Sequence, residues 1–178
     1  MQIPYLDKVI APASEPLTLA ETKLSLRVDG SEEDGYIVSL IKAARGAAEE
    51  YLRRSLVTQS WQLQFDNYVC EQVALPKGPV QSVTSVKIIA QDWSETTVSS
   101  SSYYLNAGKE QLIFRAAPIG LIIQIQYVAG YGDSTEIPYA IKQGMLAHIA
   151  SLYENRDGDV NLPQVAVDLY APFKVVKL

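Results

Sequence analysis

The spacing of apolar residues changes twice along the chain, and this change restricts the possible folds more than any other feature. Over residues 32–53 apolar side chains recur every three or four positions, which is typical of a helix with one buried face. Over residues 57–65 the repeat shortens to two, as in a half-buried strand. The helical spacing returns after Pro138. We therefore expect two helical ends around a β-rich middle.

The N-terminal part carries signals for two helices. Thr18 and Glu21 form a capping box that starts a short first helix. Ser31 and Asp34 resemble a second cap, followed by a helix from Glu32 to Arg53. The predicted buried face of this second helix comprises Tyr36, Ile37, Leu40, Ile41, Ala44, Ala47, Ala48, Tyr51 and Leu52. The opposite face comprises Glu33, Lys42, Arg45 and Glu49.

The middle of the chain has strand patterns separated by turn residues. After the strand at 57–65, further candidates are 72–75, 82–90, 103–106, 111–114 and 121–129. The connections are rich in Pro, Gly, Asn and Asp, and none has a helical pattern. Consecutive strands without crossover helices pair mostly antiparallel, so we expect a small sandwich or a partial barrel.

The C-terminal part returns to helices. Pro138 starts a third helix, and Pro163 starts a short fourth helix that Pro172 stops. The predicted apolar positions are Ile141, Met145, Leu146, Ile149, Leu152 and Tyr153 in the third helix, and Val165, Val167, Leu169 and Tyr170 in the fourth. The predicted class is α+β, a bundle of N- and C-terminal helices with an inserted antiparallel β subdomain. The predicted segments are 1–56 (helical), 57–133 (β-rich), 134–171 (helical) and 172–178 (tail).

Composition and charge exclude several classes of protein. With 178 residues, 48% of them hydrophobic and 20% charged, the chain is expected to be folded and soluble. It shows neither a signal peptide nor an apolar run that would span a bilayer, so we expect it in the cytoplasm. The net charge of −5 and the lack of a Lys/Arg cluster argue against a protein that reads nucleic acid.

Groups for catalysis or metal binding are sparse. His148 is the only histidine, and Cys70, the only cysteine, has no obvious base beside it. Asp157 and Asp159 resemble the start of a calcium loop but lack its later ligands, and Gly130-Tyr131-Gly132 lacks the lysine of a phosphate-binding loop. We therefore predict no catalytic, cofactor-binding or metal-binding residues, and we expect the chain not to be an enzyme.

Tyrosine is unusually frequent, with eleven residues against three phenylalanines. Tyrosine suits surfaces that are apolar on one side and wet on the other, including subunit interfaces. Tyr103 and Tyr104 are the candidate interface aromatics, because neighbours in a strand face opposite sides. Packing of both against neighbouring strands is an equally good interpretation.

The order of these signals resembles the head-to-tail connector, or adaptor, proteins of tailed bacteriophages and prophages. The likeness spans nearly the whole chain. It is carried, in order, by "EPLTLAETKLSLRVD" (15–29), "SEEDGYIVSLIKAARGAAEEYL" (31–52), "TQSWQLQFD" (58–66), "LPKGPVQSVTSVK" (75–87), "IQYVAGYGDSTEIPYAIKQGMLAHIASLYENRD" (125–157) and "YAPFK" (170–174).

The resemblance implies a virion structural protein whose copies form a ring of about twelve subunits beneath the portal protein. Such rings extend the DNA channel and receive the tail, so the implied partners are further copies, the portal and a tail-side completion protein. The implied location is the virion neck, after synthesis in the host cytoplasm. In related connectors the C-terminal segment docks on the portal. The candidate docking tail is Phe173, Lys174, Val175, Val176, Lys177 and Leu178.

Two alternatives from other classes stay open on the residues alone. The first is a binding module whose β surface, with Trp93, Tyr103 and Tyr104, recognises a sugar or a peptide in a concave aromatic pocket. The second is a metal-dependent hydrolase that uses His148, Asp157 and Asp159.

Overall fold

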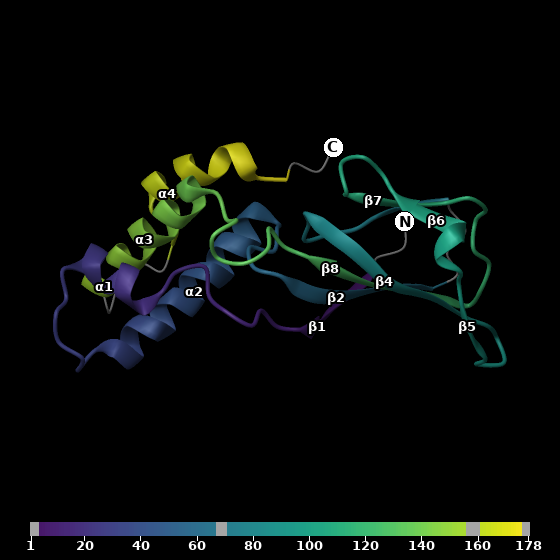
Figure 1. Ribbon diagram of the computed structural model, residues 1–178, viewed down its shortest axis with the longest axis horizontal. Coiled ribbons are helices and arrows are strands. Elements are labelled where there is room, and N and C mark those ends of the chain that lie inside the picture. Colours follow the sequence, from purple (N-terminus) through teal and green to yellow (C-terminus); the bar gives the residue numbers. More distant parts are fainter. Residues whose placement is uncertain (1–3, 67–70, 156–160, 176–178) are drawn as a thin grey trace. The chain divides into compact units, whose positions relative to one another are not determined.

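The computed structural model describes residues 4–66, 71–155 and 161–175. These residues form a mixed α and β structure with antiparallel sheets and four α-helices (Figure 1). The strands are β1 (Tyr5–Ile10), β2 (Gln59–Asp66), β3 (Gln72–Ala74), β4 (Val80–Ile89), β5 (Glu95–Thr97), β6 (Tyr103–Leu105), β7 (Gln111–Phe114) and β8 (Ile122–Ala129). The helices are α1 (Leu19–Leu26), α2 (Asp34–Leu52), α3 (Tyr139–Glu154) and α4 (Gln164–Tyr170), with 3-10 turns at Ser100–Ser102 and Ala171–Phe173.

The chain divides into two compact units. The β unit comprises Met1–Ala13 and Thr58–Tyr131, and the helical unit comprises Ser14–Val57 and Gly132–Leu178. None of the helices in the described residues is long and apolar enough to cross a membrane.

The β unit consists of two antiparallel sheets. The larger has the strand order β1-β2-β8-β4-β5 and the smaller the order β3-β7-β6. Both contribute to one core, in which Leu63 of β2, Leu112 of β7 and Ile125 of β8 are fully buried. Burying each such side chain contributes about 1.5–3 kcal/mol. Of the two predicted arrangements, the structure has the sandwich.

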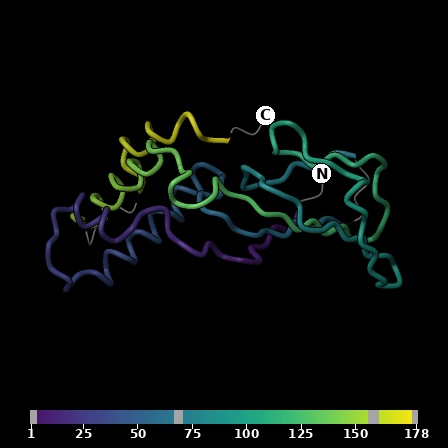
Figure 2. The backbone as a smooth tube through the Cα atoms, viewed as in Figure 1, coloured from purple at the N-terminus to yellow at the C-terminus, as the bar shows by residue number. Residues whose placement is uncertain are grey.

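The strand β1 lies where the sequence patterns predict part of the N-terminal helical segment. Residues Tyr5–Ile10 pair antiparallel with β2, fifty or more residues further along the chain (Figure 2, purple beside blue). In this register Lys8 lies opposite Trp61, and its Nζ stands 5.0 Å from the centre of the indole ring. Lys8 is exposed, and its ammonium is stabilised beside the ring by a cation–π contact. Only Leu6 of β1 is partly buried, so the strand lacks the alternation that would have identified it. The three-residue strand β5 was also not predicted.

The helix α1 begins as predicted. The Glu21 amide donates to Thr18 Oγ1 at 3.1 Å and the Thr18 amide donates to Glu21 Oε2 at 2.8 Å, so both halves of the capping box form. The predicted Ser31 cap of the next helix is wrong. α2 begins at Asp34 with Glu33 as its N-cap residue and has no side-chain cap. Asp34 pairs instead with Lys23 of α1, at 2.6 Å.

The predicted buried face of α2 is largely confirmed, but Glu49 was assigned to the wrong side. Its side chain is buried, accepts a hydrogen bond from the Leu56 amide at 3.0 Å and pairs with Arg45 at 3.2 Å. Arg45 also pairs with Glu15 at 2.6 Å. The reason is that the chain turns back after α2 and brings an amide group that needs an acceptor over Glu49.

In the C-terminal half, α3 and α4 pack closely because of one glycine. A Cβ built on Gly144 of α3 would stand 2.4 Å from Cε1 of Tyr170, so only glycine allows the tyrosine ring to lie there. Tyr170 and Ala166, four residues apart, form the buried face of α4. Val165, which was predicted to be part of the apolar face, is 59% exposed.

Candidate functional site

The described part of the predicted docking tail is attached to the end of α2. Arg54 Nε donates to the Phe173 carbonyl at 2.7 Å, and the Val175 amide donates to the Leu52 carbonyl at 3.1 Å. The ammonium of Lys174 lies 4.0 Å from the centre of the Tyr51 ring. Residues 173–175 are therefore held at a defined place at the end of α2.

The end of α2 is suited to hold a second segment. Arg53 ends the helix in a left-handed conformation, and the amides of Arg53 and Arg54 bond back to Glu50 and Glu49. The last carbonyls of a helix lack partners within the helix, and the Leu52 carbonyl receives the Val175 amide. Val176, Lys177 and Leu178 lie outside the described residues, so docking by residues 173–178 stays a prediction.

The two candidate interface tyrosines face opposite sides of β6. Tyr103 is half-buried, with its ring edge-on to Phe114 at a centroid distance of 6.1 Å, and burial raises the pKa of its hydroxyl. Tyr104 is 50% exposed. The pair therefore provides one residue that packs on the core and one that is available for contact, and the interface role of both stays a prediction.

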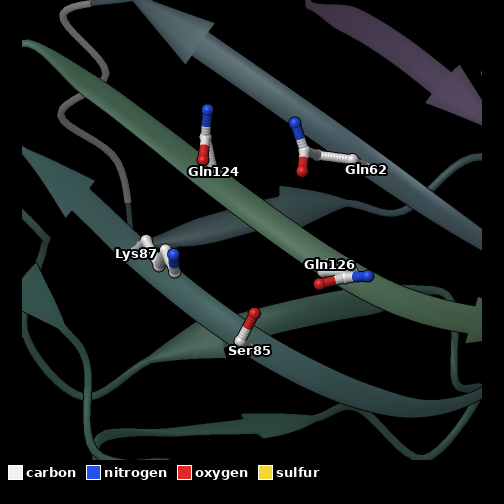
Figure 3. A pocket seen from close by; sticks show the side chains of 5 residues that line it. All are labelled: Gln62, Ser85, Lys87, Gln124 and Gln126. Atoms are coloured by element: carbon white, nitrogen blue, oxygen red, sulfur yellow. The ribbon is translucent and has the colours of Figure 1, made fainter. Parts of the chain in front are cut away.

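The outer face of the large sheet is polar and carries little net charge. Gln62, Ser85, Lys87, Gln124 and Gln126, from β2, β4 and β8, line a hollow there (Figure 3). Lys87 is the one charged residue among these five, and it pairs with Glu95 of β5 at 2.8 Å. The hollow contains none of the aromatic residues that a sugar- or peptide-binding pocket was predicted to use. Its side-chain amides suit contacts with a polar protein surface.

Of the single residues weighed for catalysis or metal binding, the structure describes His148. His148 is 2% exposed within α3, so it is a core residue and has no open path to a substrate. The described residues contain no group of three or more His, Cys, Asp or Glu side chains that could hold a metal ion. Cys70, Asp157 and Asp159 lie outside the described residues.

The sequence itself matches a known family over most of its length. The family model of head completion proteins matches residues 15–157. The chain belongs to the head completion protein family. No curated protein matches this family member.

Solved structures with the same fold come from gene transfer agent (GTA) particles. A chain from the neck of an empty GTA particle, computed with C6 symmetry, superposes on this family member with a TM-score of 0.85 and 23% identity, covering 98% of this chain and 97% of that one. A chain from the native GTA virion has a TM-score of 0.82 and 24% identity, covering 97% and 96%. A chain from the native neck, computed with C12 symmetry, has a TM-score of 0.81 and 23% identity, covering 98% and 97%.

Proposed function

We propose that this chain is a head-to-tail connector subunit of a virion or phage-like particle. Copies of it form a ring beneath the portal protein, extend the DNA channel and join the head to the tail. The observation that carries this proposal is the match of the head completion family model to residues 15–157. The fold shared with chains of GTA necks, one of them computed with C12 symmetry, supports a ring of about twelve subunits in the virion neck.

The electrostatics of the chain agree with this role. A net charge of −5 gives a channel component that DNA can pass without strong binding to its phosphates. Lys87 in the polar hollow is already paired with Glu95. The β unit then presents a weakly charged surface to neighbouring proteins, and the helices, as a bundle, form the body of the ring. The role requires no catalysis.

The proposed site of portal docking is the C-terminal segment 173–178. Its first part is held on α2 through Arg54 and Leu52, which places the start of the segment at a defined position on the helical unit. A segment whose first residues are already attached loses less conformational entropy when it binds a partner. The tail-side completion protein is the proposed partner on the opposite side of the ring.

Mixing the purified chain with its portal, followed by native mass spectrometry and cryo-electron microscopy, tests the role directly. We expect a ring of the chain on the portal, whether or not the free chain is monomeric. A chain that forms no complex with the portal and is missing from purified particles would contradict the connector role.

The docking segment has its own test. Truncation after Val175 removes residues 176–178 but keeps the hydrogen bond to the Leu52 carbonyl. We expect the truncated chain to keep its melting temperature and to lose portal binding. Leu24→Ala, at an 82% exposed position on α1, is the control and should bind normally. Normal portal binding by the truncated chain would contradict docking through residues 176–178 and leave the ring proposal standing.

A further inference from the structure

The hairpin between β4 and β5 presents a tryptophan to solvent. Trp93 lies at its turn and is 71% exposed, whereas Trp61 is 8% exposed in the core of the β unit. Its backbone is left-handed, with φ of 65°, a conformation that residues with a large side chain rarely adopt. Neither burial nor backbone preference accounts for a tryptophan at this position.

The turn that carries Trp93 is well ordered by hydrogen bonds. Asp92 Oδ1 accepts from the amide and the hydroxyl of Ser94, at 3.0 and 2.6 Å. The Trp93 amide donates to the Ala90 carbonyl at 3.0 Å, and the Ala90 amide donates to the Ser94 carbonyl at 3.0 Å. The indole is therefore held on a preorganised turn, which lowers the entropy lost when a partner buries it.

A second exposed apolar residue lies in a loop whose following residues contact the end of β4. Ile119 is 80% exposed in the loop before β8. The next residue, Gly120, packs so closely that a Cβ on it would stand 2.3 Å from Ile88 Cγ2, and the Leu121 amide donates to the Ile89 carbonyl at 2.8 Å. We call Asp92 and Trp93 the hairpin tip.

The charge of the hairpin tip distinguishes between possible partners. Asp92 is ionised at neutral pH, since its hydrogen bonds to Ser94 hold the pKa of the carboxyl below its usual range. An acidic tip is repelled by DNA and by anionic lipid surfaces. A basic protein surface is attracted, and its Lys or Arg can both pair with Asp92 and stack on the indole.

We propose that the hairpin tip docks into an apolar recess with a basic rim on a different protein of the same particle. This inference rests on the proposed connector function, because it requires the chain to be built into a particle. Trp93 provides the anchor that docking buries, and Asp92 provides the charge that orients the approach. Tryptophan is among the residues that most often dominate the binding energy of a protein interface.

Two substitutions separate docking from folding. Trp93→Gly removes the indole and relieves the left-handed backbone, so the melting temperature should stay the same or rise while docking is lost. Asp92→Asn keeps an oxygen that accepts from Ser94 but removes the charge. In particles produced with these variants, we expect the yield of functional particles to fall about tenfold or more for Trp93→Gly and by a few-fold for Asp92→Asn. Tyr139→Ala, at a 74% exposed position on α3, is the control and should have no effect.

Photo-crosslinking identifies the partner. Trp93 is replaced by a benzophenone-bearing phenylalanine analogue, particles are purified and irradiated, and crosslinked peptides are sequenced. A crosslink to a different particle protein, at a segment containing Lys or Arg, supports the inference. A crosslink to a second copy or to DNA overturns it, as does a normal particle yield with Trp93→Gly. If the wild-type chain itself is missing from particles, the connector function fails; if it is present and only the Trp93 results are negative, this inference alone fails.

Discussion

Arg54 Nε donates a hydrogen bond of 2.7 Å to the carbonyl of Phe173, a residue 119 positions further along the chain. This contact joins the end of α2 to the segment that follows α4. It connects a helix terminus, whose carbonyls need partners, with the root of the proposed docking tail.

Removing the Arg54 side chain should release the C-terminal segment. For Arg54→Ala we expect the Val175 amide to exchange its hydrogen faster, and unfolding to cost about 1–2 kcal/mol less because a hydrogen bond to a charged donor is lost. Hydrogen exchange measured by mass spectrometry checks this. Arg53→Ala, at the neighbouring exposed position, serves as the control. Equal exchange rates in Arg54→Ala and the wild type would show that Arg54 does not hold the segment.

Gly144→Ala should destabilise the helical unit. The new Cβ would stand 2.4 Å from the Tyr170 ring, so α3 and α4 must shift, at a cost of about 1–3 kcal/mol. Gly46→Ala in α2 is the matched control, because a Cβ there meets nothing within 4 Å. We expect this control to stabilise the chain by about 0.4–1 kcal/mol. Chemical denaturation of both variants gives the comparison, and a Gly144→Ala variant as stable as Gly46→Ala would disprove the packing argument.

Tyr170→Phe should leave stability unchanged or raise it by about 1 kcal/mol. The Tyr170 side chain is fully buried, and its hydroxyl has no hydrogen-bond partner among the described residues. Burial also raises the pKa of this hydroxyl, so it stays neutral at ordinary pH. Removing a buried group that makes no hydrogen bond removes its desolvation cost. A melting temperature clearly below that of the wild type would reveal a partner for the hydroxyl.

Glu49→Ala should cost about 1–3 kcal/mol, since the Leu56 amide then loses its acceptor inside the helical unit. The single variant Arg45→Met and the double variant with Glu49→Ala complete a cycle that measures the coupling between the two side chains; Arg45 also contacts Glu15. Lys42→Ala, on an exposed part of α2, is expected to change stability little. Denaturant midpoints measure all four variants, and a cost for Glu49→Ala no larger than for Lys42→Ala would speak against the buried acceptor.

The capping box of α1 should make stability depend on pH. Hydrogen bonds from Thr18, with a smaller contribution from Lys142, hold the pKa of Glu21 below its ordinary value. A carboxyl with a lowered folded-state pKa contributes stability above its unfolded pKa of about 4.3 and loses it as the pH falls through the folded value. Glu21→Gln should therefore be less stable than the wild type at pH 7. The difference should shrink below pH 4, and a constant difference in melting temperature across this range would contradict the prediction.

Local patterns predicted most elements and their types. The alternation in β2, the apolar face of α2 and the capping box at Thr18 each depend on residues within a few positions of one another. All six predicted strands are present, with small shifts of their ends. The boundaries of the four predicted segments stay a prediction, and so does the docking tail. The head-to-tail connector family suggested by the ordered motifs agrees with the family match over residues 15–157.

Most of the features that sequence reasoning missed depend on partners outside the local pattern of the segment. The strand β1 exists because β2 offers its edge, and Lys8 is accommodated by the Trp61 ring. Glu49 is buried because the chain after α2 returns over it and brings the Leu56 amide, seven residues further on, to its carboxylate. Apolar periodicity reports which face of a segment avoids water, and this is a property of adjacent residues. Which segment covers that face depends on contacts across fifty to over a hundred residues, as between Arg54 and Phe173, and these arise only when the chain is folded.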